Sequence, residues 1–189
     1  DDPGATWWGL TWTTITTDPS FANWSKVFEA WHRNPMNQRC LRAVECLRSW
    51  NDHEITDNAS PDDAFYVANL TTARSVMAAW CVGNPTNDDA GIDSGALYFR
   101  NTVGPIEHFV VDTQSYKSAI SATDNASKTL YGANQKAWLK ARLLSSTAGF
   151  RAIALGYRLG SALTDHVDGS SYQTEETEIH AHINSNGIA

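Results

Sequence analysis

The chain has 189 residues, of which 42% are hydrophobic and 19% charged, and its formal net charge is -7. This length and composition are typical of a globular chain with a real hydrophobic core, which excludes intrinsic disorder. The acidic balance argues against nucleic acid as a binding partner, and no apolar run approaches the ~20 residues that a membrane span needs.

Tryptophan is concentrated at the start of the chain, where five of the eight copies fall within the first 31 residues. Trp and Thr dominate residues 6–17, and both favour extended backbone, so we expect a strand or an irregular segment there. Large aromatic side chains of this kind usually fill a core or an interface. A face that binds carbohydrate or another partner is the alternative interpretation of the same residues.

Residues 21–34 carry the apolar spacing of an amphipathic helix. The residues at positions i, i+3, i+4 and i+7 are Trp24, Val27, Phe28 and Trp31. Side chains with this spacing share one face of a helix, which we expect to be apolar and buried. Pro35 is expected to end the helix, and residues 39–47 to form a further short one.

The next unit opens at residues 61–63 and contains a second helical repeat. Its apolar positions are Ala73, Val76, Met77 and Trp80. Thr71 or Thr72 is placed to cap the start of this helix. Residues 83–95 then indicate a polar loop, because Asn-Pro and Asp-Asp pairs break regular structure.

Two short apolar runs, residues 97–103 and 106–111, predict strands. The Gly104-Pro105 pair between them predicts a hairpin. Residues 115–127 are expected to form a loop with a turn at Asp124-Asn125.

Residues 135–145 give the clearest helical pattern in the chain. The residues expected to face the core are Trp138, Ala141 and either Leu143 or Leu144. Residues 150–155 predict a short buried strand. A last helix is expected from Glu175, with acidic residues in its first turn, to a C-cap at Asn186-Gly187.

Strands alternate with helices along the second half of this order, which indicates a layered α/β protein. Residues 1–189 then form a single domain or an incomplete domain. Its first part, residues 1–49, is a Trp-rich segment with helices, and residues 50–189 carry the candidate chemistry.

The richest group of chemically active side chains lies in residues 50–58, with the sequence Trp-Asn-Asp-His-Glu-Ile-Thr-Asp-Asn. Carboxylate and amide oxygens and an imidazole suit Mn, Fe, Mg, Ca or Zn. A polar loop in water is the alternative. Asp112 follows a predicted strand and Asp165 follows the last one, and catalytic groups of α/β sheets gather at strand ends.

Four Asn-X-Ser/Thr triplets begin at Asn23, Asn58, Asn69 and Asn125. Because this triplet is the acceptor for N-glycosylation, its repetition indicates a secreted or periplasmic protein. Asn23, Asn69 and Asn125 are the candidate glycosylation sites. The three cysteines cannot all pair within the chain, so they leave the compartment open.

Residues 50–58 resemble the W-D-D-H-E…N element of the alkaline phosphatase D (PhoD-like) family of metallophosphoesterases. Three further elements follow in the family's order. Residues 97–117 are similar to a strand pair ending in L-D-T-R-x-Y-R, and residues 131–139 to L-G-x-x-Q-x-x-W-L. Residues 165–188 are similar to D-x-W-D-G-Y…E-R…I…N-x-I, so the resemblance extends from residue 50 to residue 188.

The resemblance implies a layered metallophosphoesterase-type fold of stacked sheets flanked by helices, with a dinuclear metal site at the strand ends. Asp52 would be a metal ligand and a catalytic residue, and His53 would meet the phosphate. Asn58 would be a further ligand, and Asp112 and Asp165 would have supporting roles. The implied activity is hydrolysis of phosphate mono- or diesters with Fe, Ca, Mn or Zn ions.

The chain departs from the family pattern at Asn51, Gln114, Val167 and Ser170. The early Asp-bearing metal motifs and the late G-D-x-H motif are not in these 189 residues, so Asp52, His53 and Asn58 alone do not complete a two-metal set. The chain is then either part of a secreted metal-dependent phosphoesterase or a secreted glycoprotein with a degenerate metal site. The second alternative implies a structural or assembly role, with self-association.

Overall fold

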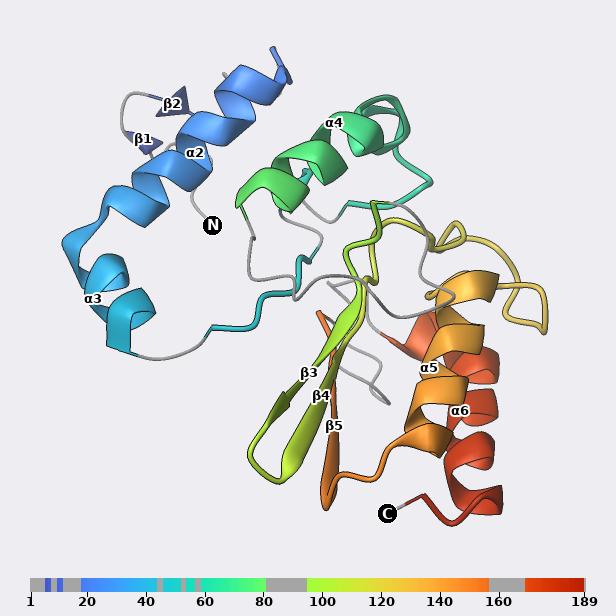
Figure 1. Ribbon diagram of the computed structural model, residues 1–189. Helices are drawn as coiled ribbons and strands as arrows, with labels where there is room; N and C mark the ends of the chain where they lie inside the picture. The colour runs from blue at the N-terminus through green and yellow to red at the C-terminus, as the bar shows by residue number, and fades with distance from the viewer. Residues whose placement is uncertain are drawn as a thin grey trace.

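A three-stranded sheet forms the centre of the second half of the chain (Figure 1). β3 (Phe99–Val103) and β4 (Ile106–Val110) are antiparallel, and β5 (Phe150–Ala154) pairs with β4 in parallel. The computed structural model describes residues 6–7, 10–11, 18–43, 46–51, 54–56, 59–80, 95–156 and 169–188. Because β4 and β5 are parallel, the segments that follow them leave the same edge of the sheet.

Two helices cover one face of this sheet. α5 (Ala133–Ser145) connects β4 to β5, and α6 (Gln173–Ser185) lies beside it after the short 3-10 helix η2 (Gly169–Tyr172) (Figure 1). α6 closes as the sequence predicts, because Gly187 has φ 59 and the Ile188 amide donates to the Ile183 carbonyl over 3.1 Å.

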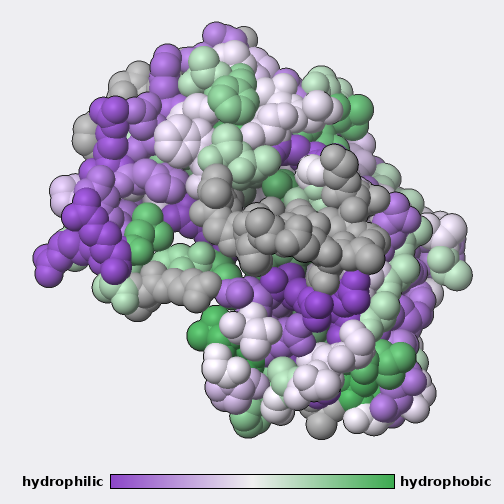
Figure 2. All heavy atoms as spheres, viewed as in Figure 1, coloured by the Kyte–Doolittle hydropathy of each residue, from purple (hydrophilic) through white to green (hydrophobic). Residues whose placement is uncertain are grey.

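The remaining helices form the first half of the described chain. α2 (Phe21–Arg33), α3 (Pro35–Ala43) and α4 (Ala64–Trp80) lie away from α5 and α6 in Figure 1. A short antiparallel pair, β1 (Thr6–Trp7) and β2 (Leu10–Thr11), precedes them. Figure 2 shows hydrophilic side chains gathered on the side of α3, a helix with no buried residue.

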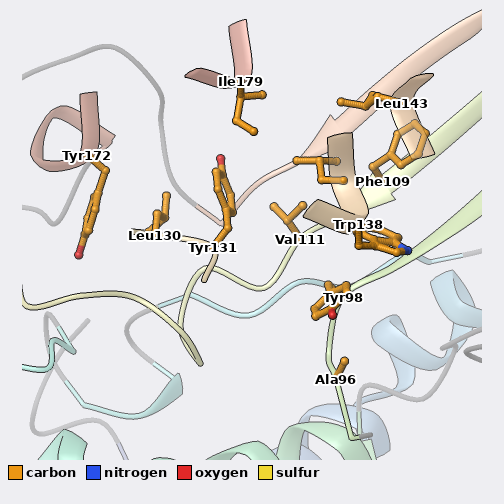
Figure 3. Packing of buried hydrophobic residues seen from close by; sticks show 11 residues of the cluster. Ala96, Tyr98, Phe109, Val111, Leu130, Tyr131, Trp138, Leu143, Tyr172 and Ile179 are labelled. Carbon is orange, nitrogen blue, oxygen red and sulfur yellow. The ribbon is translucent and has the colours of Figure 1, made fainter. Parts of the chain in front are cut away.

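The sheet and its two helices enclose the first hydrophobic core (Figure 3). Alternation along the strands sends Tyr98, Phe109 and Val111 to one face. There they meet Trp138 of α5, whose ring centroid lies 5.0 Å from Tyr98 and 6.4 Å from Phe109. Ile179 closes this core from α6.

A second hydrophobic core lies between α2, α4 and the segment that joins α3 to α4. Its buried members are Trp24, Trp50, Ile55, Ala59, Tyr66, Ala73, Val76 and Met77. Trp24 therefore faces the core as its spacing predicts. Trp50, Ile55 and Ala59 belong to this core, and Trp50 also contacts Asp112 at the end of the sheet, so it joins the two halves.

The α/β class is confirmed, as are the hairpin at Gly104-Pro105 and the helix predicted over 135–145. The spacing of apolar residues did not predict correctly which side chains of each element are buried. Trp31 is 45% exposed, Ala141 is exposed, and Leu143 is buried while Leu144 faces outward. The strand predicted as buried over 150–155 is only partly covered, and Phe150 is 66% exposed.

Two helix starts were predicted wrongly. The short helix expected over 39–47 begins at Pro35, because proline suits the first turn of a helix as well as the end of one. α4 begins at Ala64, so neither Thr71 nor Thr72 caps it. Asp63 does so instead, because its Oδ1 accepts from the Phe65 amide over 2.8 Å. No described helix is long and apolar enough to cross a membrane.

Candidate functional site

One of the sequence candidates for the site, Asp112, lies just after the carboxyl end of β4. Asp112 is described and fully buried. Asp52, His53 and Asn58 lie outside the described residues, and so does Asp165, in residues 157–168 after β5. Trp50, Asn51, Glu54 and Ala59, which flank the first three in sequence, are described.

One carboxylate oxygen of Asp112 accepts three hydrogen bonds. The Gln114 and Ser115 amides each donate to Oδ1 over 2.9 Å, and the indole Nε1 of Trp50 donates over 2.7 Å. Two of these donors close a tight turn just after the strand, and the third comes from a segment 62 residues earlier. Asp112 therefore ties the segment of the second core to the end of the sheet.

The backbone at Asp112 is held from the helix side by Gln135 of α5. The Asp112 amide donates to Gln135 Oε1 over 2.7 Å, and Gln135 Nε2 donates to the Asp112 carbonyl over 2.8 Å. Gln135 is 1% exposed, so water does not compete for these bonds. The position of Asp112 is fixed by both its side chain and its backbone.

The segment that carries Trp50 packs closely on the same strand end. Ser49 Oγ donates to the Val111 carbonyl over 3.0 Å. A Cβ added to Gly156, just after β5, would lie 2.6 Å from the Trp50 carbonyl oxygen. Only glycine fits there, because a methyl group would push the Trp50 backbone away from the sheet.

The surroundings of Asp112 hold two further buried polar groups. Burial raises the pKa of Tyr66, and the negative charge of Asp112 raises it further. Tyr66 therefore keeps its proton, and its hydroxyl donates a hydrogen bond to the Gln114 carbonyl. Lys117, 6% exposed, donates from Nζ to the Ala59 carbonyl and lies 5.4 Å from the Tyr66 ring centroid.

Buried oxygens near this turn that make no hydrogen bond within the described part of the chain include Asp112 Oδ2, Thr113 Oγ1, Ser115 Oγ and Asn51 Oδ1. Carboxylate, hydroxyl and amide oxygens are donors that hard cations prefer, so this chemistry fits a metal ion. Among the residues that can be described, no three His, Cys, Asp or Glu side chains gather into a complete ligand set.

The three glycosylation candidates differ in their surroundings. Asn23 is buried in α2, and its Nδ2 donates to Asp18 Oδ2 over 2.8 Å. Asn69 lies in α4 with its Nδ2 donating to the Phe65 carbonyl over 2.9 Å. Asn125 is exposed in a turn, so its amide nitrogen is the most accessible of the three.

Sequence reasoning did not identify Lys117 and Gln135 as parts of this site. Both lie inside stretches that resemble the family, but nothing in their local sequence marks them as buried. A signal for Gln135 was its place at the start of a helix that follows a strand end, where a long amide can reach back to the sheet.

A family model described as PhoD-like phosphatase matches residues 13–188. A solved structure titled "Structure of PhoD" superposes with a TM-score of 0.64 at 19% sequence identity, covering 88% of this chain. At that identity the match supports the fold alone. This chain spans 37% of the solved chain, and a search of curated proteins found no match.

Proposed function

The chain belongs to the PhoD-like phosphatase family, and from this premise we propose that it forms part of a metal-dependent phosphoric ester hydrolase. The family match over residues 13–188 is the observation that carries the proposal. The buried turn at Asp112 supports it, because this turn holds Trp50, two residues before Asp52, against the carboxyl end of β4. Strand ends of this kind are where α/β proteins place their reactive groups.

We assign the roles by residue. Asp52 and Asn58 would each offer an oxygen to a metal ion, Fe, Ca, Mn or Zn, with the remaining ligands supplied from outside these 189 residues. Such an ion supplies Lewis acidity toward a phosphoryl oxygen and lowers the pKa of water. His53 would donate a ring N–H to a nonbridging phosphate oxygen and so stabilise the charge that develops there.

Asp112 has a supporting role in this proposal, through Trp50. Its Oδ1 accepts three hydrogen bonds, which hold the turn at residues 112–115 and the side chain of Trp50. Asp165, in the segment that follows β5, would support the pocket from the neighbouring strand end. The substrate is a phosphate mono- or diester.

The test uses the longest natural protein that contains this chain. Asp52→Ala is expected to abolish hydrolysis of a phosphate diester, and His53→Ala to lower kcat by about 10²–10³-fold. Asp124→Ala is the control, since Asp124 is exposed and, among the described residues, accepts only from the Thr174 amide, at 3.1 and 3.4 Å. Unchanged turnover in both site variants would overturn the proposal.

Elemental analysis of the same preparation separates the proposal from its alternative. Tightly held metal in the wild type, reduced in Asp52→Ala, supports the hydrolase. No metal, no turnover and a self-associating chain would instead favour a degenerate site with an assembly role, in keeping with Asn51 and Gln114 at positions where the family pattern has Asp and Arg.

A further inference from the structure

The loop from Asp112 to Lys117 contacts both ends of the segment that joins α3 to α4. At one end Trp50 Nε1 donates to Asp112 Oδ1 over 2.7 Å. At the other end Lys117 Nζ donates to the carbonyl of Ala59. A loop of six residues therefore contacts two points that are nine residues apart in the sequence.

The loop from Asp112 to Lys117 is also held by contacts that do not involve the segment joining α3 to α4. Gln135 of α5 binds the backbone of Asp112 on both its amide and its carbonyl. The Gln114 and Ser115 amides close the turn on Asp112 Oδ1. Asp112, Thr113 and Gln114 are all fully buried, so the turn has little freedom to shift.

Lys117 is an unusual residue to find at the second contact. A lysine is seldom buried unless its ammonium group has partners, because removing the charge from water is costly. Here the ammonium group binds the Ala59 carbonyl and lies above the ring of Tyr66. The Tyr66 hydroxyl returns to the same loop, where it donates to the Gln114 carbonyl.

We propose that this loop sets the separation of the two ends of segment 50–59, and that Asp112 and Lys117 are positioning residues for the ligands carried by that segment. The inference rests on the proposed function for its link to metal binding. Groups that orient metal ligands from outside typically change metal affinity by 10–100-fold when they are removed.

The experiment measures Mn²⁺ binding to the longest natural protein that contains this chain, by calorimetric titration. Lys117→Met removes the donor to Ala59 and keeps the aliphatic length, so affinity is expected to fall at least tenfold. Lys117→Arg keeps a cationic donor and is expected to restore most of it. Trp50→Phe releases the other end and is expected to weaken Mn²⁺ binding as well, which covers the case in which Lys117→Met does not fold.

Lys128→Met is the matched control. Lys128 is 4% exposed, and its Nζ donates to the Ile120 and Ala122 carbonyls over 2.8 and 2.6 Å. It also lies 4.9 Å from the ring centroid of Tyr172. Its contacts thus match those of Lys117 in kind, but they do not reach segment 50–59. An equal loss of Mn²⁺ affinity in Lys117→Met and Lys128→Met, or no loss in Lys117→Met, would overturn the inference.

Hydrogen–deuterium exchange of the peptide covering residues 50–60 gives a readout that needs no metal. Lys117→Met is expected to speed its exchange, and Lys128→Met to leave it unchanged. If the longest natural protein binds no Mn²⁺, that result would count against the proposed function, and this exchange measurement would still decide the inference. Equal exchange in the wild type and Lys117→Met would overturn it.

Discussion

At the scale of single residues, a comparison of Trp50 with Trp138 tests how much the Trp50–Asp112 hydrogen bond stabilises the fold. The two tryptophans Trp50 and Trp138 are both buried, at 2% and 4% exposure. Trp50 Nε1 donates to a buried carboxylate, whereas Trp138 Nε1 has no hydrogen-bond partner within the described residues. Replacing each by Phe removes the same volume, so the difference reports the hydrogen bond.

We expect Trp50→Phe to lower the free energy of unfolding by about 1–3 kcal/mol more than Trp138→Phe, because it leaves a charged acceptor short of one donor. Urea unfolding of the two variants and the wild type measures this difference. Equal losses in the two variants would mean that Asp112 finds a replacement donor.

For single residues, the sequence predicts a position that depends only on the nearby strand. It does not predict burial that depends on a hydrogen-bond partner far away in the chain. Asp112 was placed correctly at the end of a strand, because the apolar run before it was visible. Glu175 lies in the first turn of α6 as expected, but its burial, at 2% exposure, was not predicted. It accepts from Thr129 Oγ1 and the Leu130 amide over 2.5 Å, contacts that no local pattern reveals.

Among the elements, α4 shows why helix boundaries were harder to predict than helices. Its first turns expose Val67 while burying Tyr66, so the apolar periodicity is blurred until Ala73. The sequence therefore suggested a cap at Thr71 or Thr72. The actual cap is Asp63, supported by the Val67 amide, which donates to the Asp63 carbonyl over 3.1 Å.

Two substitutions, one at the cap of α4 and one within the helix, test this correction. Asp63→Ala is expected to lower the free energy of unfolding by about 1 kcal/mol, the usual value of an N-cap side chain. Thr71→Ala lies at an exposed position within the helix and is expected to be neutral or slightly stabilising, because alanine is the better helix former. Thermal unfolding followed by circular dichroism distinguishes them. A larger loss in Thr71→Ala would restore the original assignment.

The faces of the elements were less predictable than their existence. Periodicity identifies a stripe of apolar side chains, but it does not say how much of the stripe another element covers. Trp31 and Phe150 both lie in correctly predicted elements and are still 45% and 66% exposed. Arg48 partly covers Trp31, with its guanidinium carbon 4.4 Å from the ring centroid, and this contact depends on a residue outside the helix.

For the molecule as a whole, the two hydrophobic cores are joined by polar contacts between residues 49–62 and 111–121. Asp62 makes contacts of this kind whose strength depends on pH. Its Oδ2 accepts from the Ile120 amide over 2.6 Å, and Ser121 Oγ donates to its Oδ1. The Ser121 hydroxyl is the main cause that lowers the pKa of Asp62 to about 2, against the opposing effect of burial, with Ser60 adding to the lowering.

A carboxylate whose pKa is lower in the folded chain stabilises that chain above the unfolded pKa, about 3.9, and loses this effect as the pH falls toward 2. We expect Asp62→Asn to cost roughly 1 kcal/mol near neutral pH, a value reduced by solvent screening because Asp62 is exposed. The difference from the wild type should shrink between about pH 4 and pH 2.

Urea unfolding at a series of pH values measures this difference directly. Asp124→Asn serves as the control, since within the part of the chain that the structure describes its carboxylate accepts only from the Thr174 amide, at 3.1 and 3.4 Å. A difference between Asp62→Asn and the wild type that stays constant from neutral pH down to about pH 2 would contradict the assignment.

The contacts between residues 49–62 and 111–121 also order events in time. Ser49–Val111 and Trp50–Asp112 are 62 residues apart in the chain, and Ala59–Lys117 and Asp62–Ile120 are 58 apart. Closing such long loops is slow compared with forming the β3–β4 hairpin, whose strands are adjacent in the sequence. During synthesis, the contacts that Asp112 and Lys117 make with the two ends of segment 50–59 can form only after Lys117 has emerged.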